Sequence, residues 1–541
     1  MSRTYQDAIA ALNSLQSNFA IVDAIRKSGK SLNLQSIPEM IEWCQKLGYQ
    51  PSDFNRLNII HIAGTKGKGS TCAFISSILS QYLPSGSQAS DTQRTLRKIG
   101  LYTSPHLRFV RERIQINNTP LSEEQFVKYF FETWDRLEEA AKARGMDPKG
   151  PGAKPVYFRF LTLMALHTYM SEGVDAAIIE CGIGGEYDST NILDKPIVTG
   201  ITSLGIDHVA LLGGTIEEIA WHKAGIMKPG AIACTAPQQE GAMKVLRDRA
   251  TEKGVELQVA TGHPQLRPDS SSAVPLGLAG DVQYKNAELA VSISAHFLRK
   301  LGFPDIPADI NSAPLPEKFK RGVETVRLGG RCEKRIEGNI AWHIDGGHTL
   351  DSIEATGKWY ASQNYASEHQ PRRSTAPKPR VLVFNQQTRD STGLARALHA
   401  TLASSSSTAG CTFTHAVFCT NVTFKEAGYR PDLVSINTNA SDVEKLSVQN
   451  NLAKVWREVS PETEQVVVAA SIEEAVEFVR GLAKAEREKK EREQNNAAAA
   501  DTAARGESDG VDGVDVSVLV TGSLHLAGGL LEVLETIVAD Q

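Results

Sequence analysis

Residues 64–71 read Gly-Thr-Lys-Gly-Lys-Gly-Ser-Thr, which is the composition of a loop that binds phosphate groups. An apolar run at 59–63 precedes this loop, and apolar residues at helical spacing follow it at 72–79. A strand, a glycine-rich turn and a helix direct backbone N–H groups and the partial positive charge of a helix start toward an anion. We expect Lys68 to reach the terminal phosphates, with a hydroxyl supplied by Ser70 or Thr71.

The spacing in this loop differs from the common phosphate-loop pattern. That pattern has four residues between its glycines and a hydroxyl residue directly after its lysine. Here two residues separate Gly64 from Gly67, and Gly69 stands between Lys68 and Ser70. For this segment alone, a glycine-rich turn of any parallel-sheet protein therefore remains an alternative.

Polar residues with functional chemistry follow other apolar runs of the chain. They are Glu180, Asp207, His208, Asp345, His348 and Ser523. Open α/β sheets bind ligands at the carboxyl ends of their strands, and a carboxylate at such an end is a natural Mg²⁺ ligand. Each candidate also has a structural alternative: Glu180 as a turn-stabilising acid, and His208 as an ordinary structural histidine.

Lys223 lies in a different setting, on an expected helix ahead of Pro229-Gly230. A lysine in that position usually extends its stem over the helix surface and keeps its ammonium in water. Residue type and position alone therefore favour a solvent-facing lysine here.

Bulk composition limits the classes of protein to consider. The chain has 541 residues, 41 % hydrophobic and 22 % charged, so we expect a globular enzyme with two or more domains. A net charge of -5 argues against a nucleic-acid partner. Seven scattered cysteines without a CxxC pair indicate reduced thiols in an intracellular compartment. No apolar run approaches the roughly 20 residues that span a bilayer, and neither a signal-peptide core nor a transit peptide is evident.

Alternating strand and helix patterns predict two α/β domains. We expect the first at 1–312, with helices on both faces of a mostly parallel sheet that includes runs at 59–63, 98–103, 176–180, 197–201 and 231–235. A linker is expected at 313–324, where a stretch that carries four prolines, 302–316, comes to its end. A smaller Rossmann-like α/β domain follows at 325–541. Within it, the composition of 484–513 predicts a helix extension followed by disorder.

The ordered set of motifs resembles the folylpolyglutamate synthases, relatives of the Mur ligases, and their eukaryotic form in particular. The motifs occur in family order over nearly the whole chain, and the unusual loop spacing is the family's own. The carrying segments are Gly64-Thr65-Lys66-Gly67-Lys68-Gly69-Ser70, Thr103-Ser104-Pro105-His106-Leu107, Arg111-Glu112-Arg113-Ile114, Phe158-Arg159-Phe160-Leu161-Thr162, Glu180-Cys181-Gly182-Ile183-Gly184-Gly185, Gly205-Ile206-Asp207-His208, Lys223-Ala224-Gly225-Ile226, Asp345-Gly346-Gly347-His348 and Val520-Thr521-Gly522-Ser523. Bacterial members often have Asn in place of Lys66 and Ala in place of Gly347.

The resemblance implies an ATP-dependent ligase that adds L-glutamate to the γ-carboxylate of a reduced folate and its polyglutamates through an acyl phosphate. It assigns Mg²⁺ to Ser104, Glu180 and His208, and it matches Lys223 to a lysine that becomes carbamylated. It also suggests K⁺ as a monovalent cation. ATP contacts are assigned to the 64–71 loop, Asn286, Arg331 and Asp345, and the glutamate site to His348 and Ser523. The expected catalytic residues are Lys68, Lys223, Asp345 and His348.

Three other functions remain open on the sequence. The nearest is dihydrofolate synthase activity, alone or combined with the ligase. A non-catalytic nucleotide-binding switch belongs to a different class, and an amide ligase for another carboxylate is the third. Expected partners are small molecules, with no nucleic acid and no integral membrane segment. The chain is expected to be a monomer of the cytoplasm, the mitochondrial matrix or both.

Overall fold

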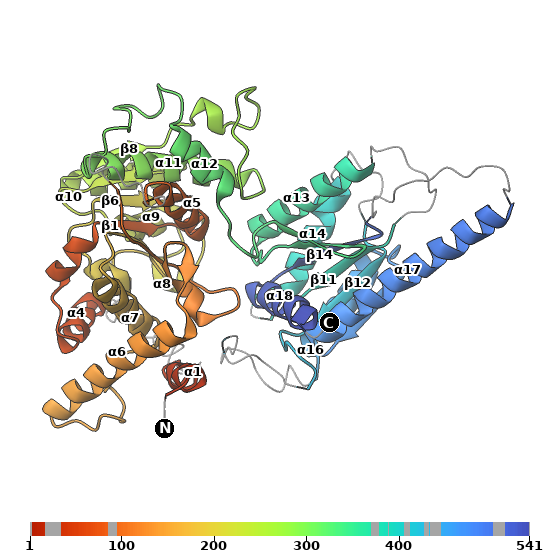
Figure 1. Cartoon of the computed structure of the whole chain (residues 1–541), viewed down its shortest axis with the longest axis horizontal. Helices are drawn as coiled ribbons and strands as arrows, with labels where there is room; N and C mark the ends of the chain where they lie inside the picture. Colours follow the sequence, from red (N-terminus) through yellow and green to blue (C-terminus); the bar gives the residue numbers. More distant parts are fainter. Residues whose placement is uncertain are drawn as a thin grey trace. The chain divides into compact units, whose positions relative to one another are not determined.

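The structure, a computed structural model, divides the chain into two compact units, Met1–Leu328 (unit 1) and Gly329–Gln541 (unit 2). Each unit is built around its own sheet (Figure 1). The described residues are 3–16, 34–84, 95–368, 378–387, 389–404, 412–426, 432, 445–500 and 514–539.

Unit 1 contains an eight-stranded sheet in the order β4-β3-β2-β5-β1-β6-β7-β8. Its strands are β1 Ile59–Ala63, β2 Ile99–Tyr102, β3 Ile114–Ile116, β4 Thr119–Pro120, β5 Ala176–Glu180, β6 Val198–Ile201, β7 Ile232–Thr235 and β8 Glu256–Val259. The pairs β2–β3 and β3–β4 are antiparallel, and all others are parallel. The five runs expected in this sheet are therefore strands, and the fold class is confirmed.

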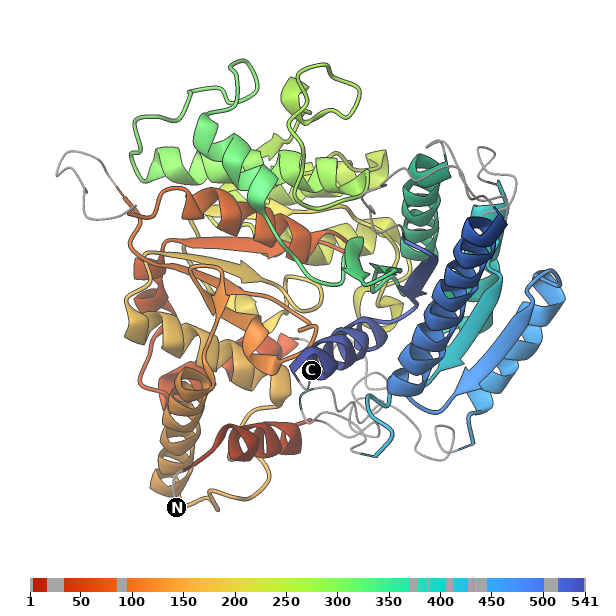
Figure 2. The same cartoon turned by 45° about the vertical axis from the view of Figure 1, so that its right-hand side comes forward.

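Helices cover both faces of this sheet. They are α1 Tyr5–Ser14, α4 Ser36–Lys46, α5 Lys68–Ser80, α6 Glu123–Ala143, α7 Tyr157–Glu172, α8 Val209–Leu212, α9 Ile216–Ala224, α10 Glu240–Lys253, α11 Val282–Lys300 and α12 Glu317–Thr325, with 3₁₀ turns η1 Pro51–Leu57, η2 Val110–Arg113, η3 Ser189–Ile192 and η4 Pro264–Leu266. Ile60 and Ile62 of β1 pack in the core beneath α5 and α11, whereas Ile59 packs with α4, α6 and α7 on the other face. A strand buried on both faces needs a continuous apolar run, which is why 59–63 shows no alternation. Figures 1 and 2 show α5 and α11 side by side above β1.

The expected linker at 313–324 is not a linker in the structure. Residues 317–324 belong to helix α12, whose Phe319 and Val323 are buried in the core of unit 1. A Cβ on Gly322 would lie 2.6 Å from the Cα of Ile78 on α5, so the two helices pack backbone to backbone. The division between the units falls after Leu328.

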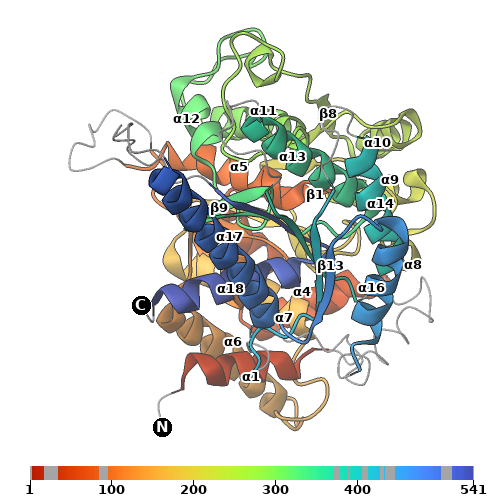
Figure 3. The same ribbon diagram turned by 90° about the vertical axis from the view of Figure 1, so that its right-hand side faces the viewer.

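Unit 2 contains a six-stranded sheet in the order β13-β12-β11-β14-β10-β9. The strands are β9 Glu333–Glu337, β10 Ile340–Ile344, β11 Arg380–Phe384, β12 His415–Cys419, β13 Gln465–Ala469 and β14 Val516–Thr521, and the helices are α13 Leu350–Glu368, α14 Ser391–Ser404, α16 Ser447–Val459, α17 Ile472–Ala500 and α18 Leu524–Ala539. Only β9, at the edge, is antiparallel to its neighbour. Figure 3 shows α17 and α18 on one face and α14 and α16 on the other.

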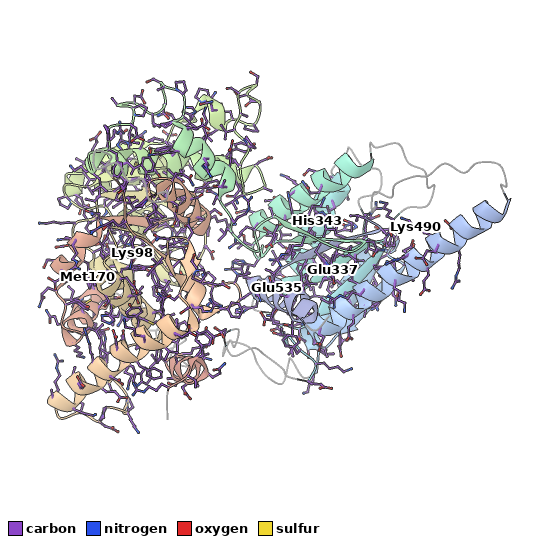
Figure 4. All side chains as sticks on the ribbon, viewed as in Figure 1. Lys98, Met170, Glu337, His343, Lys490 and Glu535 are labelled. Carbon is purple, nitrogen blue, oxygen red and sulfur yellow. The ribbon has the colours of Figure 1, made fainter. Side chains whose placement is uncertain are left out.

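The expected insertion at 484–513 begins as helix, because α17 continues to Ala500. Lys490, labelled in Figure 4, lies on this extension and contacts Asp515 at the start of the following segment. The expected disorder falls on 501–513, outside the described residues. Among the helices that the structure describes, none is long and apolar enough to cross a membrane.

Candidate active site

The glycine-rich loop joins β1 to α5, as expected. Gly64 has φ +151° and Gly67 has φ +85°, both in the region that favours glycine. A Cβ on Gly64 would lie 1.8 Å from Thr202 Oγ1, and one on Gly67 would lie 2.2 Å from Asn286 Oδ1. Both glycines are therefore required by conformation and by the close approach of a neighbouring side chain.

The end of β6 holds this loop in place. The backbone N–H groups of Thr65 and Lys66 both donate to Ser203 O at 3.1 Å, and Thr202 Oγ1 donates to Lys66 O at 2.7 Å. Thr65 Oγ1 donates in turn to Gly205 O at 3.1 Å. Sequence reasoning missed Thr202 and Ser203, although their place directly after an apolar strand was the available signal.

The start of α5 has the features of an anion site. Gly67 is its N-cap and brings no capping side chain, and a thirteen-residue helix begins there. The first N–H groups of such a helix and its dipole attract phosphate. Thr71 Oγ1 is buried and has no hydrogen-bond partner among the described residues, which fits a hydroxyl that awaits a ligand.

Two lysines donate to one carbonyl oxygen at this loop. Lys68 Nζ lies 3.1 Å and Lys223 Nζ lies 2.8 Å from Gly64 O. Lys223, on α9, is only 3 % exposed, so the solvent-facing alternative is wrong. Burial, followed by repulsion from Lys68, lowers the pKa of Lys223 to about 7. A large fraction of this amine is therefore neutral near neutral pH.

The glycine turn that follows Glu180 fixes the position of Lys223. Glu186 N donates to His222 O at 2.6 Å, and a Cβ on Gly225 would lie 2.3 Å from the Cα of Glu186. Gly225 is thus a glycine because the turn lies directly against the end of α9. This contact couples the position of Glu180 to that of Lys223.

Of the three expected metal ligands, the structure brings two into direct contact. Glu180 is 3 % exposed at the carboxyl end of β5, and Ser104 N donates to its Oε2 at 2.9 Å. A Cβ on Gly69 would lie 3.8 Å from the same oxygen, so Glu180 faces the start of α5. His208 is exposed, with φ +52°, after the end of β6. In the described part of the chain no three His, Cys, Asp or Glu side chains form a metal cluster.

A buried carboxylate beside a phosphate loop still fits Mg²⁺. This ion commonly takes one or two protein carboxylates and completes its shell with water and substrate phosphates. Asn286, the remaining candidate in unit 1, is buried on α11, and its Nδ2 donates to Gln283 Oε1 at 3.0 Å. Its Oδ1 lies against Gly67, as the Cβ distance above shows.

In unit 2, Asp345 organises the turn after β10. Its Oδ1 accepts from Gly347 N at 2.8 Å and Thr356 Oγ1 at 2.7 Å, and its Oδ2 accepts from Cys332 N at 2.9 Å. Arg331 precedes Cys332 directly, which places both nucleotide candidates of this unit at one turn. Because these three groups donate to its carboxylate, Asp345 has a structural role in holding the turn, in addition to any role in binding a ligand.

His348 and Ser523 lie on turns that contact each other. Gly522 N donates to Gly347 O at 3.0 Å. His348 Nδ1 lies 2.9 Å from Gly346 O, and because a carbonyl only accepts, Nδ1 carries the proton and Nε2 accepts in the neutral ring. Ser523 Oγ accepts from His525 N at 3.1 Å at the start of α18, which leaves its own hydrogen to donate.

Sequence reasoning also missed Asn385 and Gln386, which follow β11 at the same end of the sheet. Gln386 Nε2 donates to Gly522 O at 2.8 Å, and Asn385 Nδ2 donates to Asn421 Oδ1 at 2.8 Å. Their position directly after an apolar strand was the same signal that identified Asp345.

Comparison with known proteins gives the family. The chain is 47 % identical over 536 residues to the probable folylpolyglutamate synthase of Schizosaccharomyces pombe, covering 99 % of this chain and 95 % of that protein. It belongs to the folylpolyglutamate synthase family. It is also 43 % identical over 540 residues to the folylpolyglutamate synthase of Saccharomyces cerevisiae, covering 99 % of this chain and 88 % of the relative. A scan against protein-family models found no match.

Solved structures of the family share the fold. The Mycobacterium tuberculosis folylpolyglutamate synthase complexed with ADP and AMPPCP is 23 % identical with a TM-score of 0.61, covering 91 % of this chain and 94 % of that one. A structure described as an FPGS–AMPPCP–folate complex is 22 % identical with a TM-score of 0.58, covering 87 % of this chain and 97 % of that one. The two-unit α/β architecture is therefore that of family members.

The low pKa of Lys223 makes a prediction about stability. Replacing Lys223 by Met removes a buried amine whose proton is retained in the unfolded chain up to pH 10.5 but is lost near pH 7 in the folded one. Between these values the unfolded state binds more protons, so the wild type gains stability as pH rises. Below pH 7 it bears the full cost of a buried charge, on the order of a few kcal/mol. We expect Lys223→Met to show a flatter pH dependence of the unfolding free energy.

Chemical unfolding of both proteins from about pH 6 to pH 9 measures this difference. The control is Lys244→Met on α10, where the side chain is exposed and paired with Asp248 at 2.9 Å. Curves for the wild type and Lys223→Met that stay parallel over this range would contradict the prediction.

Proposed function

We propose that this protein is an ATP-dependent ligase that adds L-glutamate to the γ-carboxylate of tetrahydrofolate and its polyglutamates. The observation that carries the proposal is 47 % identity over 99 % of the chain to a probable folylpolyglutamate synthase. The phosphate loop, Glu180 and Lys223 assembled in unit 1 support it, because they supply what a phosphoryl transfer to a carboxylate requires. Folate and the ATP analogue AMPPCP are named together for one structure that shares the fold.

The residues of unit 1 fit the first half-reaction. An oxygen of the folate γ-carboxylate attacks the γ-phosphorus of ATP, the bond to ADP breaks, and an acyl phosphate forms. Both reactants are anions, so positive charge must offset their repulsion. Lys68 and the N–H groups at the start of α5 would hold the phosphates. Glu180, with Ser104 and His208, would hold Mg²⁺, which supplies further charge neutralisation when bound.

The residues of unit 2 fit the binding of glutamate. Ser523 Oγ keeps a hydrogen to donate to a carboxylate, and His348 lies on the neighbouring turn, which Gly522 N contacts through Gly347 O. The amine of glutamate attacks the acyl carbon, releases a proton, and the tetrahedral intermediate expels phosphate to leave the amide. We assign Arg331, Asn286 and Asp345 to the nucleotide, with Asp345 also holding its turn.

Carbamylation of Lys223 is part of the proposal. A neutral amine attacks CO₂ and loses a proton, which leaves an anionic N-carboxylate, and a pKa of about 7 makes neutral amine available. The repulsion between Lys68 and Lys223 then becomes attraction. A ¹³C carbamate signal from protein incubated with labelled bicarbonate, absent in Lys223→Met, measures it.

The acceptor experiment tests the function. Purified protein is given ATP, Mg²⁺, glutamate and either tetrahydrofolate or dihydropteroate, and both ADP and product mass are followed. We expect glutamate-dependent ADP release and lengthening of tetrahydrofolate. Product formed from dihydropteroate would show that the protein also has dihydrofolate synthase activity. ATP turnover without glutamate incorporation into any folate would refute the folate ligase. The two remaining functions would then be a nucleotide-binding switch and an amide ligase that acts on another carboxylate.

The remaining expectations stay part of this proposal. A K⁺ requirement is tested by exchanging K⁺ for Na⁺ in the same assay. A monomer is tested by light scattering of the purified chain. We place the protein in the cytoplasm, the mitochondrial matrix or both, to be tested by cell fractionation. The six cysteines in the described residues are free thiols, which is compatible with either compartment.

A further inference from the structure

The amine of Lys223 is placed by packing and not by its neighbours in sequence. Its Nζ donates to Gly64 O, which lies 159 positions away in the chain. The side chain is 3 % exposed, and the helix that carries it, α9, ends one residue later at Ala224. The segments packed against the end of α9 therefore determine where the amine lies.

The turn at Gly185 and Glu186 lies directly against Lys223. A Cβ on Gly185 would lie 3.0 Å from the Cα of Lys223, and Glu186 N donates to the carbonyl of the residue before it at 2.6 Å. A shift of this turn would therefore shift the backbone that carries the amine. Reactions between held groups are sensitive to such shifts, because a misplacement of about 1 Å can cost about 100-fold in rate.

Arg249 of α10 joins this turn to α9. Its Nη2 donates to Glu186 Oε2 at 2.5 Å, and its guanidinium carbon lies 4.5 Å from the ring centroid of Trp221 on α9. The side chain of Arg249 is 8 % exposed and that of Glu186 is 24 % exposed, so this ion pair is screened less than a surface pair. Figure 3 shows α9 and α10 side by side. One arginine thus contacts both the turn and the helix, two residues before Lys223.

Asn191 of η3 joins the same two segments by hydrogen bonds. Its Nδ2 donates to Glu186 O at 2.9 Å and to Gly225 O at 3.3 Å. Both partners are carbonyl oxygens, which only accept, so the amide has one orientation here. Both hydrogens of Nδ2 are thereby used, one on the turn and one just after the end of α9. Asn191 is itself buried, which favours a fixed geometry.

We infer that Arg249 and Asn191 are positioning residues, which hold the turn at Glu186 against α9 and so keep Lys223 Nζ at Gly64 O. The inference rests on the proposed function and deepens it, because the carbamate would form at the place that these two residues define. Lys68 donates to the same carbonyl oxygen and would stabilise that anion. Both residues act through the turn and not on the reacting atoms.

The test compares the wild type with Arg249→Met, which keeps an apolar stem and loses the donors. One measurement is kcat and KM for ATP with tetrahydrofolate as acceptor. The other is the bicarbonate concentration that gives half of the maximal ¹³C carbamate signal. We expect kcat about 10-fold lower, about 10-fold more bicarbonate and a KM for ATP within about 2-fold, the usual cost of losing a supporting contact. A displaced carbamate loses the attraction of Lys68, which weakens with distance.

Further variants keep the test decisive. In Arg249→Met, Lys253 remains 3.8 Å from Glu186 Oε2, so this carboxylate keeps a cationic partner. Arg249→Lys keeps the charge but not the planar donors, and both values should be intermediate. Asn191→Ser has a single hydroxyl hydrogen and cannot donate to both carbonyls, so both values should change in the same direction. Arg247→Met is the matched control, an exposed arginine on the same helix, and it should change neither value.

The outcomes separate the inference from the function beneath it. If Arg249→Met does not fold, Arg249→Lys and Asn191→Ser decide by the same two measurements. If these variants lower kcat but leave the bicarbonate requirement unchanged, their role is structural and the inference is wrong. Equal changes in Arg247→Met would overturn it as well. If the wild type ligates glutamate without any carbamate signal, the inference is wrong and the ligase stands. If the wild type lengthens no folate, the proposed function itself is wrong.

Discussion

Replacing Lys68 by Met should lower kcat for glutamate-dependent ADP release by about 100- to 1,000-fold, the usual cost of removing one preorganised charge from a phosphoryl-transfer site. Lys68 opens α5 directly after the Gly67 cap, and its Nζ lies 3.1 Å from Gly64 O. An ammonium in that place faces the position of the terminal phosphates. Its loss removes charge where two anions must meet, so the rate should fall more than the KM for folate rises.

Lys68→Met should have a second effect that loss of packing would not produce. Lys68 is one of the groups that lower the pKa of Lys223, so its removal should raise that pKa and reduce the neutral fraction of the amine. The pH at which activity reaches half its maximum should therefore move upward. Lys244→Met controls for the loss of a lysine at an exposed site. If Lys68→Met has the kcat of the wild type, the prediction is wrong and the 64–71 loop is an ordinary glycine-rich turn.

Glu180→Gln should lower kcat by about 100-fold or more and raise the Mg²⁺ concentration needed for half-maximal rate. The substitution preserves shape and leaves an oxygen to accept the 2.9 Å hydrogen bond from Ser104 N. It removes only the negative charge that a divalent cation prefers. A fold defect is not expected, because a buried neutral amide costs less than a buried carboxylate.

A Mg²⁺ titration of Glu180→Gln at saturating ATP measures this effect. Glu317→Gln is the control, because that carboxylate lies on α12 and its side chain is 86 % exposed. If Glu180→Gln responds to Mg²⁺ as the wild type does, Glu180 stabilises the turn and does not bind metal. That result would confirm the structural alternative that the sequence left open.

The buried parallel strands of the first sheet could be predicted because each is an apolar run followed by polar or glycine residues, and β8 is the exception. β1 and β5 are buried on both faces, and for this reason both consist mostly of apolar residues. The strands β3, β4, β8 and β9 were missed for the opposite reason. They are short or carry alternating charged residues, as Glu333–Glu337 does, and gain their order from the neighbouring strand.

The linker prediction failed because prolines were read as breaks. Pro316 is instead the N-cap position of α12, and Phe319 and Val323 stand four residues apart on the face that packs into unit 1. A proline next to a helix start followed by apolar residues at that spacing is a helix signal. The sequence therefore contained the signal for α12, but the prolines before it favoured the linker interpretation.

The burial of Lys223 could not be predicted from residue type. Helix α9 ends in Trp-His-Lys-Ala, and nothing local distinguishes a buried lysine there from a solvated one. What buries it is the turn at Gly185-Glu186, 37 residues or more away in the chain. Family resemblance assigned the residue a role, and only tertiary structure supplies the environment that makes the role chemically reasonable.

The carbonyl of Gly64, shared by Lys68 and Lys223, links nucleotide binding to the uptake or release of protons. Phosphates bound at the start of α5 bring negative charge close to both amines and favour the charged form of Lys223. Such a site takes up protons when it is filled, and the heat of nucleotide binding then depends on the buffer that supplies them. A carbamate on Lys223 abolishes this dependence, because the nitrogen no longer titrates. The buffer dependence of binding enthalpy thus reports which chemical form of Lys223 the protein carries.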